Sequence, residues 1–191
     1  MMENVLPQRK PTRLRDFDYS REGAYFITIC TRDRMQVLSE IVNITSDGDK
    51  LTTSRRNLSM VGEGLAPPEF QIRLKPCGEI VKEQLHLITT RFTTVTVEDY
   101  VIMPDHIHAI IYLHGDVEAG GASPSPTLND VVCAFKSLTS RICKQRLSVE
   151  KIFQRSYAEH VVRDKEDYET RRRYIYENPM RWYYKYIFKG E

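Results

Sequence analysis

Cysteine is scarce in the sequence, and the four residues present lie far apart: Cys30, Cys77, Cys133 and Cys143, with no Cys-x-x-Cys pair among them. A zinc knuckle or a compact disulfide framework needs cysteines at short, regular spacings, and this pattern fits neither. We therefore expect the chain to work in a reducing compartment, the cytoplasm.

Long hydrophobic runs are missing as well. The first ten residues contain no apolar core of the length that a signal peptide has. The longest run of aliphatic and aromatic residues, Ala109 to Leu113, is far too short to cross a bilayer. The sequence therefore predicts a soluble protein that is neither exported nor attached to a membrane.

A large excess of one charge is also absent, since 28 basic residues face 26 acidic ones and the formal net charge is +2. The overall balance therefore says little about partners, but two local clusters of basic residues could. One lies in an N-terminal arm, residues 1–22, and the other lies among aromatics near the C-terminus, including a tail at residues 180–191. Their members are Arg9, Lys10, Arg13 and Arg15, and Arg171, Arg172, Arg173, Arg181, Lys185 and Lys189. Each cluster fits a solvated surface as well as it fits a nucleic-acid contact.

With 191 residues, of which 41% are hydrophobic and 28% charged, the chain is long enough to bury one sizeable core. We expect residues 1–191 to form a single domain. The segment 24–31 (AYFITICT) is rich in β-branched and aromatic residues, which predicts a buried strand. Residues 43–76 lose this periodicity and gain glycine and proline, which indicates an insertion that ends in a short strand at 70–74.

The remaining elements follow from hydrophobic spacing. In chain order it predicts a helix over residues 78–92, strands over 95–103 and 106–113, a helix over 128–145, a strand over 157–163 and a helix over 165–177. Pro104-Asp105 forms a two-residue turn, so the two strands that it joins are antiparallel. Asn178-Pro179 is expected to end the last helix, because the residue before proline is disfavoured in helical geometry. The order β, α, β, β, α, β predicts an α+β, ferredoxin-like (RRM-like) antiparallel sheet with an extra C-terminal helix.

Two histidines stand at the start of the predicted strand 106–113. Residues two apart in a strand face the same side, so His106 and His108 present their imidazoles together while Ile107 turns into the core. Imidazole is the commonest neutral metal ligand, and two of them leave positions open for substrate oxygens and one more protein group. A bare His-x-His pair is nevertheless more often two ordinary histidines than a metal site.

The setting of this pair is far more specific than the pair itself. The segment Tyr100 to Ile111 (YVIMPDHIHAII) resembles the histidine-hydrophobe-histidine segment of the single-tyrosine transposases of small insertion sequences. The chain as a whole is similar to their relatives associated with repetitive extragenic palindromes, the REP-associated tyrosine transposases. The similarity covers most of the chain except the insertion and the last ten residues, and it departs from the family at Phe153, where tryptophan is common. Its other motifs are Thr12-Arg13-Leu14, YFITICT at 25–31, FQRSY at 153–157, EHVVR at 159–163, Asp167-Tyr168 and YIYENP at 174–179.

This resemblance implies a site. Tyr174 is the expected nucleophile on the C-terminal helix, and Asn178 is the expected third ligand, beside His106 and His108, of a divalent metal, Mg²⁺ or Mn²⁺. Helical spacing agrees, because residues i and i+4 share a face and would both point at the sheet that carries the histidines. Tyr176, two positions on, would point away. The family chemistry gives a 5′-phosphotyrosine and a free 3′-hydroxyl on single-stranded or hairpin DNA.

Further residues are expected to contact DNA or to support the site. The expected DNA contacts are Arg9, Lys10, Arg13, Arg15, Lys136 and Arg172. For Lys136 and Arg141 a solvated helix face is the simpler interpretation, although similar proteins use this helix near DNA. Glu159 and His160 are adjacent on a predicted strand, so only one of them can face the site, and His160 is interpreted as structural or supporting rather than as a ligand.

Three hypotheses of function remain open. The first is a metal-dependent single-stranded DNA endonuclease and strand transferase that acts on hairpins of palindromic repeats. The second is a catalytically silent DNA-binding protein that keeps the transposase fold. The third, a histidine-dependent phosphohydrolase of small nucleotides, ranks last because the sequence lacks a third histidine at strand spacing and a phosphate-binding glycine loop. The sequence leaves open whether the protein is a monomer or a homodimer.

Overall fold

The computed structural model describes residues 18–44, 69–115 and 125–187. Its main sheet contains β1 (Gly23–Cys30), β4 (Val95–Ile102), β5 (His106–Leu113) and β6 (Ala158–Val161). These strands lie in the order β4-β5-β1-β6, and every neighbouring pair is antiparallel. Helix α1 (Pro76–Arg91) precedes β4, and α2 (Leu128–Leu147) lies between β5 and β6. This is the order and pairing of a split βαβ sheet, so the predicted ferredoxin-like fold is confirmed.

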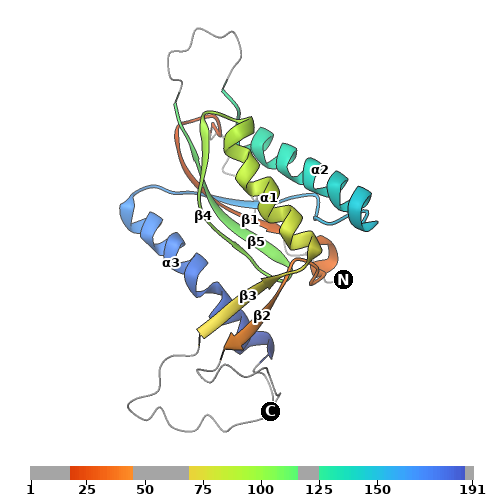
Figure 1. The fold of residues 1–191 in the computed structure, drawn as a ribbon. Coiled ribbons are helices and arrows are strands. Elements are labelled where there is room, and N and C mark those ends of the chain that lie inside the picture. The colour runs from red at the N-terminus through yellow and green to blue at the C-terminus, as the bar shows by residue number, and fades with distance from the viewer. Residues whose placement is uncertain (1–17, 45–68, 116–124, 188–191) are drawn as a thin grey trace, which may run out of the picture.

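Both faces of the main sheet are covered. Helices α1 and α2 cover one face, and α3 (Lys165–Trp182) crosses the other (Figure 1). Alternate residues of a strand point to opposite faces. In β1, Tyr25, Ile27 and Ile29 join the core beneath α1 and α2, whereas Phe26 joins the core beneath α3. Strand β5 is buried along almost its whole length because helices lie on both sides of it.

A second, two-stranded sheet lies beside the main one, and the sequence pattern predicted only one of its two strands. Strand β2 (Ser39–Ile44), which the sequence pattern did not reveal, pairs antiparallel with β3 (Glu69–Leu74). Residues 45–68, most of the predicted insertion, lie outside the described residues. The described ends of that segment therefore form a hairpin, which contacts the turn directly after α3 through the ring of Phe70, 5.0 Å from that of Tyr183.

The predicted end of the last helix was wrong. Helix α3 runs through Pro179 to Trp182 and continues as a π-helical turn, Tyr183–Ile187. Proline inside a helix removes the bond from its own nitrogen to the carbonyl four residues back, here that of Ile175. Ile175 and Trp182 are both buried against the sheet, on either side of the proline, and we attribute the continuation to this packing. Packing of the helix against the sheet thus outweighs the local tendency of Asn178-Pro179 to end it.

The described helices show no membrane-spanning candidate, since none combines the length with the apolar character that crossing a bilayer needs.

Candidate active site

The turn between β4 and β5 sets where the two histidines lie. The backbone N–H of Met103 donates to the carbonyl of His106 at 2.8 Å, which closes the predicted two-residue turn. Thr31, just after β1, donates both its backbone N–H (2.9 Å) and its hydroxyl (3.0 Å) to the carbonyl of Asp105. The residue directly before β5 is therefore tied to the residue directly after β1, which limits the position of His106.

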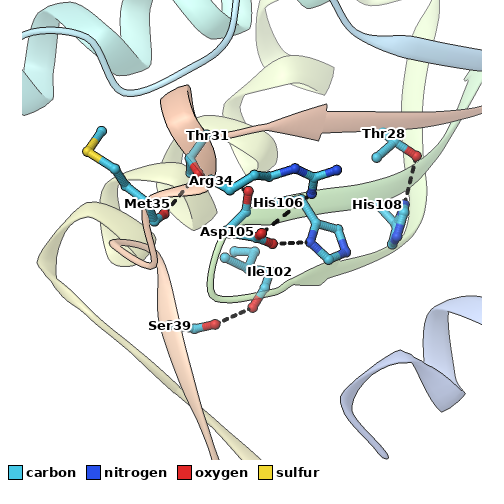
Figure 2. A network of polar contacts seen from close by, with 9 residues as sticks. All are labelled: Thr28, Thr31, Arg34, Met35, Ser39, Ile102, Asp105, His106 and His108. Carbon is cyan, nitrogen blue, oxygen red and sulfur yellow. Dashed lines mark hydrogen bonds and ion pairs between the residues drawn. The ribbon is translucent and has the colours of Figure 1, made fainter. Parts of the chain in front are cut away.

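His106 and His108 lie side by side on the face of the sheet that α3 covers. Their ring centroids are 4.6 Å apart, and the residues are only 8% and 5% exposed. A buried imidazole needs partners for its nitrogens. Figure 2 shows one partner for each: Oδ1 of Asp105 lies 2.5 Å from Nδ1 of His106, and Oγ1 of Thr28 lies 2.9 Å from Nδ1 of His108. Because Nδ1 is engaged in both rings, Nε2 is the nitrogen that each ring has left for a ligand.

Burial also sets the protonation state of this pair. Burial, together with the smaller effect of the adjacent His106, lowers the pKa of His108 from its ordinary value of 6.5 to about 3. His108 is therefore a neutral imidazole at physiological pH. The neutral form is the one that coordinates metals, because the lone pair of one nitrogen is available.

One stripe of α3 faces the two histidines. The ring of Tyr174 lies 5.1 Å from that of His108, and the ring of Trp182 lies 5.8 Å from that of His106. Asn178 is four residues from each of them and 6% exposed, so helical periodicity places it on the same stripe, between the two ring contacts. The structure thus brings Tyr174 and Asn178 to the face that carries the histidine pair.

Tyr176 points elsewhere, as the helical spacing predicted. Its hydroxyl lies 3.5 Å from a carboxylate oxygen of Asp99, and the guanidinium of Arg172 lies 5.8 Å from its ring centroid. Tyr174 instead has Phe26 at 6.0 Å and the guanidinium of Arg181 at 5.6 Å from its ring. With 36% of its surface exposed, Tyr174 is both packed against the site and open to a substrate.

The donor atoms at this place fit a hard or borderline divalent ion. Within residues 18–44, 69–115 and 125–187, no group of three or more His, Cys, Asp or Glu side chains could hold a metal. An ion on His106 and His108 would therefore need a ligand of another type, and Asn178, on the stripe of α3 that faces them, carries an amide oxygen. Two imidazole nitrogens and an oxygen suit Mn²⁺ at least as well as Mg²⁺.

The other predicted residues lie away from this site. The ammonium of Lys136, on α2 and hence on the opposite face of the sheet, donates to the backbone carbonyls of Gln154 and Arg155, both at 2.8 Å. Burial lowers its pKa. Arg172 is paired with Asp99 at 3.2 Å. The predicted contacts in the N-terminal arm lie outside the described residues: Arg9, Lys10, Arg13 and Arg15.

His160 has a structural partner rather than a place beside the other histidines. Its Nε2 lies 2.6 Å from Oδ2 of Asp167, and Nε of Arg171 donates to the other carboxylate oxygen, Oδ1, at 3.0 Å. His160 therefore joins β6 to the first turn of α3. This arrangement agrees with the interpretation of His160 as structural.

Several residues around the site escaped the sequence analysis. Asp105 stands directly before His106, so its role as a partner could have been suspected from the motif. Thr28 and Phe26 come from β1, and they reach the site only through the pairing of β1 with β5, in which Thr28 lies opposite His108. Trp182 lies beyond the predicted helix end. Pairing register and helix continuation, which a local pattern does not reveal, account for these omissions.

The fold and the placement of these side chains define a class: a ferredoxin-like sheet with a histidine pair on its central strand, facing a tyrosine-bearing helix. No model of a known protein family matches the sequence. A protein of Haemophilus influenzae with an uncharacterized function is 27% identical over 187 residues, which is 91% of this chain and 89% of that protein.

Among solved structures, a REP-associated tyrosine transposase bound to a REP hairpin is similar, with a TM-score of 0.54 and 19% sequence identity. The match covers 88% of this chain and 73% of that one. The chain therefore has the fold of a REP-associated tyrosine transposase, as the sequence motifs predicted.

Proposed function

We propose that this protein cuts and rejoins single-stranded DNA at hairpins, with Tyr174 as the nucleophile. One observation carries the proposal: the ring of Tyr174 lies against His108, 5.1 Å between centroids, while Asn178 follows one helical turn on. The nucleophile, the two imidazoles and the amide thus come from two separate parts of the chain and meet on one face of the sheet.

His106, His108 and Asn178 would hold a Mg²⁺ or Mn²⁺ ion. When bound, such an ion neutralises charge that develops on the scissile phosphate and on the attacking oxygen. The protein's own part is to keep both imidazoles fixed and, for His108, neutral. Asp105 and Thr28 fix the rings by holding Nδ1 of each, which sets the orientation in which Nε2 is offered, and burial keeps His108 neutral.

Tyr174 performs the covalent step. Its phenolic oxygen forms a bond to phosphorus, the bond from phosphorus to the 3′ oxygen breaks, and that oxygen leaves as a 3′-hydroxyl after taking up a proton. A 5′-phosphotyrosine remains, and attack by another 3′-hydroxyl reverses the step and rejoins a strand. A free phenol has a pKa of about 10 and is a weak nucleophile at neutral pH, so the step needs a cationic surrounding. The guanidinium of Arg181 lies 5.6 Å from the ring centroid and shares its charge with the carboxylate of Glu177, 2.7 Å away.

Binding of DNA is assigned to basic residues away from the chemistry. The structural neighbour was solved with a REP hairpin, which supports a hairpin as the substrate of this chain too. The N-terminal arm with Arg9, Lys10, Arg13 and Arg15 supplies four positive charges within seven residues, enough to follow a phosphate backbone. Arg172, 44% exposed at its side chain, keeps access to solvent even while paired with Asp99.

The test is the covalent adduct itself. Protein is incubated with 3′-labelled hairpin oligonucleotides and Mn²⁺ or Mg²⁺, and the products are separated under denaturing conditions. We expect a labelled protein band with the wild type and with Tyr176→Phe, and none with Tyr174→Phe. The two variants remove the same hydroxyl two residues apart on one helix and keep the ring, so loss of folding cannot explain a difference. An adduct that persists in Tyr174→Phe refutes the assignment. No adduct with wild-type protein favours a DNA-binding protein without turnover.

A further inference from the structure

Exposed apolar side chains gather at the end of α3 and in the π-helical turn after it. Four of the seven large hydrophobic residues exposed in the described parts of the chain fall between residues 180 and 187: Met180 (40%), Tyr184 (38%), Tyr186 (53%) and Ile187 (50%). Large apolar side chains exposed together on a protein surface usually mark an interaction site. The proposed cutting of DNA makes no use of this surface.

A row of aromatic rings connects this surface with the histidine pair. The ring of Trp182 lies 5.8 Å from that of His106 and 4.3 Å from that of Tyr186. The neighbouring Tyr183 is held by Phe70 of β3 at 5.0 Å. The hairpin β2–β3 therefore packs against the turn. The ring of Trp182 lies between the exposed ring of Tyr186 and the ring of His106, a candidate metal ligand.

Positive charge is interleaved with these rings. The ammonium of Lys185 lies 4.9 Å from the ring centroid of Tyr186, and Arg181 extends from the same end of α3 toward Tyr174. This alternation of cations and aromatic rings suits an unpaired nucleotide, since its base stacks on an aromatic face and its phosphate pairs with a cation. A paired base is stacked inside the duplex and cannot use such a ring.

We propose that Tyr186, supported by Trp182 and accompanied by Lys185, is a stacking platform for an unpaired base next to the scissile phosphate. The inference rests on the proposed function, because the position of the platform has meaning only if DNA is cut at His106 and His108. The platform selects for a single-stranded flank beside a hairpin. It also fixes the register of the strand, since one stacked base sets which phosphate reaches Tyr174.

The test measures binding without cleavage, using the full chain in EDTA and a fluorescent hairpin with single-stranded flanks on both sides. We expect Tyr186→Leu, which keeps an apolar side chain but removes the ring, to weaken binding roughly five- to tenfold, the lower range for loss of one stacked base. Tyr186→Phe keeps the ring and should bind like the wild type. Tyr176→Leu is the matched control, an equal change at an exposed tyrosine of the preceding helix, α3, whose side chain faces Asp99.

A second measurement locates the base. 2-Aminopurine is placed at each unpaired position in turn, and one position should lose fluorescence on binding to wild type and to Tyr186→Phe but not to Tyr186→Leu. An abasic site there should weaken wild-type binding by the same factor and remove the difference between wild type and Tyr186→Leu.

Three outcomes would overturn the inference, and they separate it from the proposed function. If wild type forms the Tyr174 adduct and Tyr186→Leu binds the flanked hairpin as tightly as wild type, the platform is wrong and the proposed function stands. If Tyr186→Leu instead changes the molecular mass measured by light scattering while DNA binding is unaltered, the surface joins two copies of the chain. If wild type binds no hairpin at all, both proposals fail.

Discussion

Removing the carboxylate of Asp105 should weaken metal binding while leaving the fold intact. This side chain is buried, with Oδ1 2.5 Å from Nδ1 of His106 and Oδ2 3.5 Å from Arg34. The backbone carbonyl of Asp105, not its side chain, holds the turn through Thr31. The change Asp105→Ala therefore removes the partner of a ligand without removing the bonds that shape the turn.

The size of the effect follows from these contacts. Losing the hydrogen-bond partner of a metal-ligating histidine typically lowers metal affinity about 10- to 100-fold, because the ring is freed to rotate and its basicity falls. Arg34 is 56% exposed at its side chain, so its guanidinium returns to water and adds little to the loss. Asp105→Asn keeps an oxygen that accepts from Nδ1–H but lacks the charge. We expect wild type to bind Mn²⁺ most tightly, Asp105→Asn about tenfold more weakly and Asp105→Ala most weakly.

Isothermal titration of the metal-free protein with Mn²⁺ measures this order, and urea unfolding checks that each variant is folded. The paired control is Arg34→Ala, which removes the second contact of the same carboxylate and should bind Mn²⁺ within about twofold of wild type. Equal Mn²⁺ affinity in wild type and a folded Asp105→Ala would show that the bond between Asp105 and His106 does not position a ligand.

Four further outcomes are expected. His106→Ala or His108→Ala should abolish the covalent adduct while hairpin affinity, measured by anisotropy, stays near wild type, since phosphate contacts dominate affinity; cleavage at the wild-type rate would contradict the two-histidine site. Deletion of residues 1–15 should make DNA binding less dependent on salt: the slope of log affinity against log salt should fall in magnitude by about 0.7 for each phosphate that the arm no longer neutralises. An unchanged slope would show that the basic residues of the arm are solvated and do not contact DNA. Lys136→Met should lower the free energy of unfolding by about 1–2 kcal/mol, because it strands backbone carbonyls that the ammonium now satisfies, and an unchanged urea midpoint would argue against this role. In metal-free protein the pKa of His108 is about 3, below its unfolded value of 6.5. Its contribution to the free energy of unfolding is therefore complete above pH 6.5 and falls by about 1.4 kcal/mol per pH unit as the pH drops toward 3. His108→Gln should lack this pH dependence when the free energy of unfolding is measured in urea at several pH values.

The sequence predicted the elements whose pattern is long and regular. Strand β5 was predicted with its observed ends, and α1, α2 and β4 within a few residues, because each has a sustained hydrophobic period. Strand β2 was not predicted, since SEIVNI is short and its partner β3 begins 25 residues after it ends. A strand whose only partner is distant in sequence gives little local signal.

The candidate site, like the fold, could be predicted from the sequence only where a local pattern determines it. The family resemblance singled out Tyr174 and Asn178, and helical and strand periodicity predicted that each pair, Tyr174 with Asn178 and His106 with His108, shares one face of its element. The partners of the two imidazoles, above all Thr28, depend on which residues β1 and β5 set opposite each other. Trp182 required the helix to pass Pro179, which depends on packing energy that no local rule contains.

The histidine pair belongs to the sheet and the tyrosine to α3, and the two elements are joined by packing and by polar contacts at the start of the helix, such as that of His160 with Asp167. Ile175 and Trp182, buried beneath the helix, hold Tyr174 at its distance from His108. Reaction rates fall steeply with small errors in the distance between attacking and attacked atoms, about a hundredfold for a displacement of roughly 1 Å. In the proposed reaction, the aliphatic and aromatic side chains packed beneath α3 would thus set the distance between Tyr174 and the histidine pair. Repacking the underside of this one helix would then change or abolish the proposed cutting while the proposed ligands and nucleophile stay unchanged.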